Sequence, residues 1–397
     1  MKLYCLSEKV NRQYASISKT VRSHERRNTM RIEAAVTYEK GAPFKIEEVE
    51  LDAPKFGEIL VRIVASGICH TDEAVQHQFI PTPLPAVLGH EGAGVVEAVG
   101  PGVYDFEVGD RVGISFGFCN CCVNCRKARP FMCKSLNKIN FGGIQPDGTT
   151  RLHTLDGRDL STFFGQSSFA RYAVVNQNHA FKVTDDTIDL GLVAPMGCGI
   201  QTGAGAVLNR LRPEFGSSIA VYGCGTVGMS AIMAAKIAGC QQIIAVGGNP
   251  KSLELAKELG ATDTVNRKEV DDLVAAVKKT SLSGEGVNYS IDTTGIADCV
   301  RQALGFLDFD GTCVVLGATG DITFNVQNEL MGEGKSLIGV IEGDSVPKLF
   351  LPTLLDYYKK GQFPFDKLIK FYPFEQINEA QAESDAGKCI KAVLRMD

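Results

Sequence analysis

The sequence predicts an α/β protein in which a mostly β domain is joined to a domain built on a doubly wound parallel sheet. Two features of the pattern predict this fold. Short apolar runs separated by Gly and Pro fill residues 30–199, as in β-strands joined by tight turns. Beyond residue 199, strand-like and helix-like runs alternate, as in a parallel doubly wound sheet. A chain of 397 residues has room for two or three domains with a large core.

The first domain is expected to begin at Met30. Apolar runs predict strands at residues 32–36, 59–64, 94–99 and 110–113, and such short strands favour a compact, partly open barrel. Residues 1–29 are basic and poor in acids, and they lack the apolar stretch of a secretory signal. We expect an N-terminal extension there. A disordered tail, an upstream start codon and an organellar transit peptide all remain open.

The second domain is predicted at residues 200–342. Apolar runs predict strands at residues 219–222, 243–246, 289–292 and 313–316, with helices ending near residue 238 and covering 253–259. Residues 217–235 carry no charge, but glycines divide them into strand, turn and helix, which argues against a membrane span. From residue 343 prolines interrupt the pattern. A last strand at 388–394 is expected to return to the first domain, which then comprises 30–199 and 343–397.

Composition narrows the classes of function. Lys and Arg number 41 against 46 Asp and Glu, a net charge of -5, which gives no general attraction to nucleic acid or anionic membrane. We therefore expect a cytoplasmic protein without either partner. The 13 cysteines are an odd number that fits poorly with a full set of disulfides, so metal or reduced thiols must explain them.

Four cysteines form the first candidate metal site. Cys119, Cys122, Cys125 and Cys133 are spaced so that a short loop can wrap one tetrahedral ion, which predicts a closed, structural zinc site. An iron–sulfur cluster, a loop of free thiols and a zinc-ribbon nucleic-acid module are the weaker alternatives. Cys121 falls out of this spacing and is expected to be a bystander.

A second, open metal site is indicated by residues from three separate motifs. Cys69 and His90 each follow a predicted strand, and Cys198 lies at the border between the two domains. Two thiolates and one imidazole make a three-ligand zinc site with a free fourth position, the arrangement that catalysis needs. Each residue alone is weak evidence, since single Cys and His residues usually belong to the core.

A glycine motif predicts a dinucleotide site after the strand at 219–222. Gly223 allows a tight turn, Gly225 lets a pyrophosphate approach the backbone, and Gly228 lets helix and strand pack closely. Thr226 and Val227 complete the motif, which precedes a predicted helix.

The next strand lacks the acid that usually binds the ribose of NAD. No Asp or Glu occurs between Gly228 and Leu253, and the strand ends in Gly247, Gly248 and Asn249, followed by Lys251. A neutral turn with one Lys leaves room for a 2′-phosphate, whereas a carboxylate would repel it. The sequence therefore predicts a preference for NADP(H) over NAD(H). The alternative is that Gly247 merely relaxes selectivity.

These motifs resemble the zinc-dependent medium-chain alcohol dehydrogenases, and most of all their aryl (benzyl) and allylic alcohol branch. The match runs from about Met30 to the C-terminus, and the matching stretches are Gly67-Ile68-Cys69-His70-Thr71-Asp72, residues 88–96, the four-cysteine loop and Gly197-Cys198-Gly199 with Thr202-Gly203. The resemblance implies a GroES-like catalytic domain, a Rossmann coenzyme domain, two Zn²⁺ per chain and a small alcohol or aldehyde substrate. It also implies a homodimer, with a tetramer as the alternative, and residues 336–341 could pair across the two-fold axis.

The resemblance assigns roles around the catalytic metal. It implies that Cys69, His90 and Cys198 hold the zinc, with Glu91 close behind it, and that Asp72 orients His90, as a metal-bound imidazole generally requires.

Proton transfer is the next implied role. Thr71 would pass the alcohol proton, but the histidine that ends the relay in liver-type enzymes is replaced by Ala74. The relay must then end in water, in ribose hydroxyls of the cofactor or in His77.

The remaining implied contacts concern the cofactor and the substrate. His70 and Lys391 would help to hold the pyrophosphate, Thr202 would contact the nicotinamide side, and Leu316 is also expected at the cofactor. An apolar pocket near the zinc could be lined by three aromatic residues, with core packing as an equal explanation for them: Phe116, Phe118 and Phe141.

Other functions stay open as alternatives. An NAD-linked member of the same family could act on another substrate, such as a glutathione adduct of formaldehyde. A polyol dehydrogenase and a zinc-free enone reductase fit the ligand sets less well. A catalytically silent binding protein of this fold should have lost ligands or glycines, yet all are present.

Overall fold

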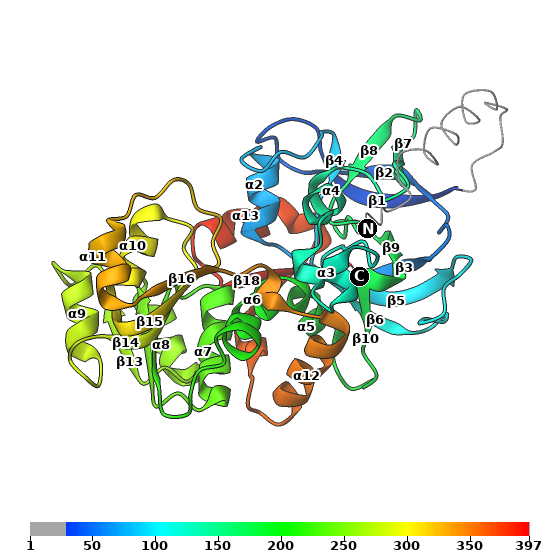
Figure 1. The fold of residues 1–397 in the computed structure, drawn as a ribbon. Coiled ribbons are helices and arrows are strands. Elements are labelled where there is room, and N and C mark those ends of the chain that lie inside the picture. The colour runs from blue at the N-terminus through cyan, green and yellow to red at the C-terminus, as the bar shows by residue number, and fades with distance from the viewer. Residues whose placement is uncertain (1–28, 397) are drawn as a thin grey trace, which may run out of the picture.

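The computed structural model describes residues 29–396, so the predicted extension lies outside the described residues except for Thr29. The chain forms two domains that lie side by side (Figure 1). The β-rich domain contains the first strands and the last strand of the chain, and the parallel-sheet domain lies beside it.

The β-rich domain is made of two sheets. Five strands close a barrel in the order β1-β2-β7-β8-β4, and seven form a sheet in the order β10-β6-β5-β3-β18-β17, with β9 paired to β3. The strands are β1 (Thr29–Thr37), β2 (Lys45–Asp52), β3 (Glu58–Gly67), β4 (Ala86–Val87), β5 (Gly92–Val99), β6 (Arg111–Ile114), β7 (Leu152–Thr154), β8 (Asp159–Thr162), β9 (Tyr172–Asn176), β10 (Ala180–Lys182), β17 (Ile369–Pro373) and β18 (Lys391–Arg395). Its helices are α2 (His70–Gln76), α3 (Val123–Arg126), α4 (Leu136–Phe141), α5 (Leu190–Val193) and α13 (Ile377–Asp385).

The barrel is closed, whereas the sequence predicted a partly open one. The closing strands β7 and β8 were not predicted, because they are short. Both lie within residues 135–165, a segment here termed the insert. β7 pairs with β2, and β8 pairs with β4.

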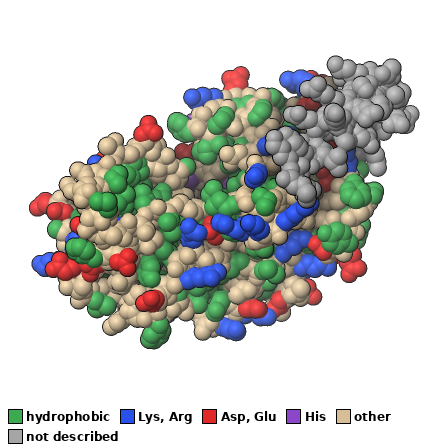
Figure 2. Space-filling view, in the orientation of Figure 1, with side chains coloured by type: hydrophobic (Ala, Val, Ile, Leu, Met, Phe, Trp, Pro, Cys, Tyr) green, Lys and Arg blue, Asp and Glu red, His purple; other side chains and the backbone are tan. Residues whose placement is uncertain are grey.

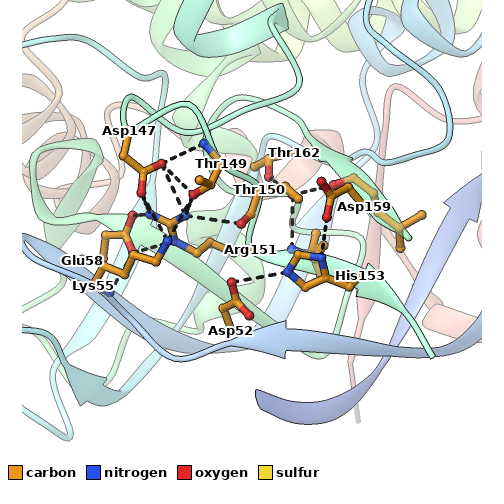
Figure 3. Close-up of polar contacts among 12 residues, drawn as sticks. Asp52, Lys55, Glu58, Asp147, Thr149, Thr150, Arg151, His153, Asp159 and Thr162 are labelled. Carbon is orange, nitrogen blue, oxygen red and sulfur yellow. Dashed lines mark hydrogen bonds and ion pairs between the residues drawn. The ribbon is translucent and has the colours of Figure 1, made fainter. Parts of the chain in front are cut away.

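A buried ion-pair network holds this insert to the central sheet (Figure 3). Arg151 donates to both carboxylate oxygens of Glu58, from Nη2 at 2.7 Å and from Nε at 3.0 Å. Its Nη2 also lies 2.9 Å from Asp147 Oδ2. Further along the insert, His153 Nδ1 lies 2.8 Å from Asp159 Oδ1. Because Glu58 begins β3, the insert is anchored to the strand that leads toward Cys69.

The parallel-sheet domain has six strands in the order β13-β12-β11-β14-β15-β16, and all neighbouring pairs are parallel. The chain proceeds outward from β11 to β13 and then returns to the other side of β11, which is the doubly wound arrangement. The strands are β11 (Ser218–Tyr222), β12 (Gln242–Gly247), β13 (Asp263–Asn266), β14 (Val287–Asp292), β15 (Leu307–Val315) and β16 (Ser336–Gly339). The helices are α6 (Gly199–Gly205), α7 (Thr226–Ala238), α8 (Pro250–Leu259), α9 (Leu273–Thr280), α10 (Ala297–Gly305) and α11 (Val326–Glu329). The helix α12 (Pro347–Lys359) follows this domain and contacts β10 of the β-rich domain.

The C-terminal part differs in two details from the predicted pattern. Prolines were expected to interrupt it, yet α12 spans thirteen residues, with Pro347 in the first turn and Pro352 inside the helix. The helix persists because Leu351 and Leu354 bury its apolar face. The last strand begins at Lys391 rather than at residue 388.

One apolar core joins the two domains. It contains Ala93 and Val393 from the β-rich domain, Ile200 and Ala204 from α6, and Val221 from β11. Since Cys198 immediately precedes α6, this ligand candidate lies where the domains meet.

No single helix among residues 29–396 is both long and apolar enough to cross a membrane. Two consecutive helical segments, Leu190–Gly197 and Gly199–Leu211, are together long and apolar enough by length and composition only. The two segments meet at an angle of 62°.

Basic side chains gather near the middle of one face of the molecule (Figure 2). Arg129, Arg210 and Arg212 line a hollow of about 700 Å³ together with apolar residues of α12 such as Leu349. Asp344 lies 3.7 Å from Arg210 and offsets part of this charge.

Candidate active site

Three loops bring the predicted catalytic ligands together. Cys69 caps the N-terminus of α2, and Cys198 precedes α6. His90 follows Gly89, which has a φ of +89°. A Cβ on Gly89 would lie 2.4 Å from the Phe169 nitrogen, so this position has no room for a side chain. The ligand atoms of Cys69, His90, Glu91 and Cys198 lie within 4.8 Å of one another.

Asp72 fixes two of these ligands. Its Oδ1 lies 3.0 Å from His90 Nδ1 and also accepts from the Gly89 nitrogen at 3.0 Å, while its Oδ2 accepts from the Cys69 nitrogen at 3.0 Å. His90 Nε2 is buried and has no hydrogen-bond partner within the described part of the chain. A buried imidazole nitrogen left free between two sulfurs is the donor set that fits zinc.

The electrostatics of the cluster favour a bound cation. The Cys198 thiol donates to the Cys69 sulfur, and this contact lowers the pKa of Cys69 well below its usual value. The same contact, together with burial, raises the pKa of Cys198. A metal ion bound by both sulfurs would replace this contact between the two side chains. Burial alone would lower the pKa of His90, but the charge of Asp72 raises it.

Glu91 lies behind the cluster and pairs with Lys391. The Lys391 Nζ donates to Glu91 Oε1 at 2.9 Å, to Oε2 at 2.8 Å and to the Ile68 carbonyl at 2.9 Å. Both side chains are buried. Burial raises the pKa of Glu91 to about 7, against the opposing charge of Lys391. These three contacts involve the Lys391 ammonium group in the described chain, and its expected contact with a pyrophosphate stays a prediction.

Aromatic side chains surround the cluster. The ring centroid of His90 lies 4.5 Å from that of Phe164 and 5.4 Å from that of Phe163, two residues that sequence reasoning missed. Phe141 contacts Phe164, with centroids 5.2 Å apart. In the sequence these two residues appear as a Phe-Phe pair before Gly165. Hydrophobic periodicity could not distinguish such a pair from ordinary core residues.

The two other predicted aromatics pair with each other beside the cysteine loop. The ring centroids of Phe116 and Phe118 lie 6.0 Å apart. Only Phe116 is fully buried.

The predicted proton relay is only partly assembled. Thr71 Oγ1 lies 3.7 Å from the Cys69 sulfur, beside the metal cluster. His77 lies at the end of α2 and stacks on Phe79, with ring centroids 6.1 Å apart. Within residues 29–396 no hydrogen bond joins His77 to Thr71.

The four-cysteine loop forms a second cluster. The sulfurs of Cys119, Cys122, Cys125 and Cys133 lie within 4.8 Å of one another, and Cys121 lies outside this group and is exposed. Backbone nitrogens point at the sulfurs, as in Cys119 N to Cys133 Sγ at 3.3 Å. Burial opposes ionisation of Cys122, but backbone N–H groups lower its pKa to about 6. Burial and the neighbouring sulfurs raise the pKa of Cys125, so the four cysteines differ, but the approach of all four sulfurs fits a closed zinc site.

A buried polar network links the Cys198 loop to the chain that returns from β16. Gln201 Nε2 donates to Ser115 Oγ at 2.7 Å and to Glu342 Oε2 at 3.0 Å, and Gln201 Oε1 accepts from Ser345 Oγ at 2.9 Å. Glu342 has a φ of +52°, and burial raises its pKa to about 7. Neither Gln201 nor Glu342 was predicted, because their contact depends on chain topology.

A groove of about 350 Å³ lies along the ends of β11 and β12. It is lined by six of the predicted cofactor residues, His70, Gly223, Gly225, Gly247, Gly248 and Asn249. Gly223 has a φ of +105°, Gly225 faces open space, and a Cβ on Gly228 would lie 1.8 Å from the Gly223 oxygen. These are the three positions that a phosphate-binding turn requires.

The remaining cofactor candidates lie outside the walls of this groove. Thr202 Oγ1 donates to the Cys198 carbonyl at 2.8 Å, and Thr226 Oγ1 donates to the Ile390 carbonyl at 3.1 Å. The others are Val227, Gly228, Lys251, Leu316 and Lys391. Their contacts with a cofactor stay predictions. Among the lining residues that were missed is Arg267, which follows β13.

Comparisons with known proteins agree with these features. The family described as "Alcohol dehydrogenase GroES-like domain" matches residues 55–185, and the family "Zinc-binding dehydrogenase" matches residues 226–356. A geraniol dehydrogenase from Castellaniella defragrans is 41% identical over 365 residues, which cover 91% of this chain and 97% of that protein.

Two solved structures are similar over 93% of this chain and 100% of theirs. An alcohol dehydrogenase zinc-binding domain protein from Burkholderia ambifaria is 48% identical, with a TM-score of 0.90. A benzyl alcohol dehydrogenase from Acinetobacter calcoaceticus is 42% identical, with a TM-score of 0.88. The fold and site define a zinc-type oxidoreductase with GroES-like and Rossmann domains. The chain belongs to the medium-chain alcohol dehydrogenase family, as the sequence predicted.

Proposed function

We propose that this alcohol dehydrogenase interconverts primary allylic or benzylic alcohols and their aldehydes, with NADP(H) preferred over NAD(H). Its relatives named for geraniol and benzyl alcohol support the substrate class. The aromatic residues beside His90, Phe163 and Phe164, support it as well, because flat, unsaturated substrates pack favourably against aromatic rings.

The residues at the metal cluster would have different roles in the reaction. When bound, zinc would act as a Lewis acid toward the alcohol or carbonyl oxygen. Cys69, His90 and Cys198 would hold it, and Asp72 keeps the His90 ring oriented through Nδ1. The Thr71 hydroxyl can both accept and donate, so it would carry the alcohol proton away from the buried cluster.

The proposed cofactor preference rests on the absence of an acidic residue at the end of β12. Gly247 and Gly248 line the groove where a Rossmann domain that binds NAD carries a carboxylate for the ribose hydroxyls. Without that carboxylate, no like charge opposes a 2′-phosphate there.

The cofactor preference is tested by Gly247→Asp, with Gly247→Asn as the neutral control of nearly the same size. We expect the ratio of kcat/KM for NADP to that for NAD to fall steeply in the Asp variant and much less in the Asn variant. A wild-type enzyme that prefers NAD, or a ratio that is unchanged in Gly247→Asp, would contradict the proposal.

Substrate class is tested by a panel of benzyl, cinnamyl, geranyl and short aliphatic alcohols with both cofactors. The unsaturated alcohols should have the higher kcat/KM, by about tenfold or more, because they bury more apolar surface against the aromatic rings. Equal or better activity on short aliphatic alcohols would favour a general alcohol dehydrogenase.

A homodimer is the proposed assembly. β16 lies at the edge of the parallel sheet, and the exposed apolar residues Met331 and Ile341 are close to it in sequence. A third exposed apolar residue, Phe309, lies in the neighbouring strand β15. An unpaired strand edge with apolar neighbours is a natural surface for a two-fold contact. Light scattering should then give twice the mass of the chain, and the mass of a monomer would contradict the proposal.

A further inference from the structure

We propose that Arg267 binds the 2′-phosphate of NADP(H) and is the residue that gives the groove its selectivity. This inference rests on the proposed cofactor preference and adds the group that recognises the phosphate. No sequence motif selects Arg267, since it follows the polar strand β13, far from the glycine motif along the chain.

Strand pairing places Arg267 beside the glycine turn. β12 and β13 are parallel neighbours, and Gly247 is the register partner of Asn266. The Arg267 nitrogen donates to the Gly247 carbonyl at 2.8 Å. The arginine therefore starts at the position where the ribose of a bound dinucleotide would approach the end of β12.

The glycine turn leaves space that the Arg267 side chain occupies. A Cβ on Gly248 would lie 3.0 Å from Arg267 Nε and 3.1 Å from Lys268 Cε. A side chain at Gly248 would require the Arg267 and Lys268 side chains to shift. Arg267 lines the same groove as Gly247, Gly248 and Asn249, and its Nε atom lies beside Gly248.

The Arg267 side chain hydrogen-bonds the neutral Tyr222, and no acid in the described chain forms an ion pair with it. Asp271 and Asp298 line an adjoining hollow with Arg267, but no ion pair within 4.0 Å joins Arg267 to an acid in the described chain. Asp385 is the acidic residue that lines the groove itself. A planar guanidinium group can bind two phosphate oxygens at once, which a single carboxylate across the groove does not prevent.

The test measures binding of two adenosine fragments by calorimetry, without turnover. Adenosine 2′,5′-bisphosphate carries the 2′-phosphate, and AMP lacks it. In Arg267→Gln the Kd for the bisphosphate should rise about tenfold or more, while the Kd for AMP changes less than about twofold. In Arg267→Lys the Kd for the bisphosphate should rise by an intermediate factor. Lysine keeps the positive charge but lacks the planar guanidinium group that can bind two phosphate oxygens.

Lys257→Gln is the matched control, because Lys257 is an exposed cation on α8 of the same domain. It should leave both Kd values unchanged. If the wild type prefers the bisphosphate and Arg267→Gln keeps that preference, the assignment of Arg267 is wrong and the cofactor proposal stands. If the wild type binds AMP at least as tightly as the bisphosphate, the cofactor proposal itself fails.

Discussion

At the scale of single residues, Asp72 organises the catalytic cluster. Its two oxygens accept from the Cys69 nitrogen, the Gly89 nitrogen and His90 Nδ1, and it is almost completely buried. A carboxylate can satisfy all three donors, whereas an amide must turn its NH₂ group toward one of them. Asp72 therefore holds two ligands in place without touching the metal position.

Asp72→Asn should weaken zinc binding at the catalytic site by about 10–100-fold. Competition with a chromogenic chelator measures this, and one zinc per chain should be lost early while the other is retained. Asp156→Asn, on an exposed residue, is the control and should behave like the wild type. Equal retention in Asp72→Asn and the wild type would show that Asp72 does not position the ligands.

His179 predicts a pH dependence of stability. It is buried beside the cysteine loop, where Nε2 accepts from the Phe118 nitrogen at 3.1 Å, and burial lowers its pKa to about 4. The unfolded chain takes up this proton near pH 6.5, whereas the folded chain takes it up only near pH 4. The stabilisation is therefore complete above pH 6.5 and is lost as the pH falls toward 4.

Urea unfolding of the wild type and His179→Asn between pH 7 and pH 5 measures the effect. The asparagine can still accept from the Phe118 nitrogen but does not titrate. The wild type should lose about 2 kcal/mol more stability than the variant over this range. Parallel pH profiles would contradict the assignment.

At the scale of elements, the Arg151 network secures the insert that closes the barrel (Figure 3). Arg151 and Glu58 have side chains only 3% and 6% exposed. Removing one partner of a buried pair leaves the other charge without compensation, at a cost of about 3–5 kcal/mol. Arg151→Met should reduce the free energy of unfolding by that order, and Arg151→Met with Glu58→Gln should recover part of it. A single variant as stable as the wild type would contradict this role.

The regular elements of the sheet domain were predictable because their signal is local. β11, β12 and β14 are short apolar runs bounded by turns, and the glycine motif at Gly223 fixes the first strand-to-helix turn. β13 was not predictable, since only Val265 in it is buried. α12 was missed because Pro352 argues against a helix until its buried leucines are seen.

The site residues also differ in whether a local sequence motif identifies them. Cys69, His90 and Cys198 could be selected because each lies in a recognisable motif. Gln201, Glu342 and Arg267 carry no such motif, and their positions follow from how distant strands pair and where the chain returns between domains.

At the scale of the whole molecule, the site lies where the two domains share a core. The metal cluster takes Cys69 and His90 from the β-rich domain and Cys198 from the junction with α6. His70, next to Cys69, lines the groove that also contains Gly223 and Gly247. The fold therefore brings the metal cluster and the dinucleotide groove together through adjacent residues.

The central claim is that one chain holds two zinc ions of different kinds. It is tested most directly by measuring zinc per chain in the purified wild type and in Cys198→Ser. The wild type should contain two zinc ions, and Cys198→Ser should retain the one held by the four-cysteine loop while losing alcohol oxidation. A wild type with one zinc or none, or a Cys198→Ser variant that keeps two zinc ions and full activity, would contradict the claim.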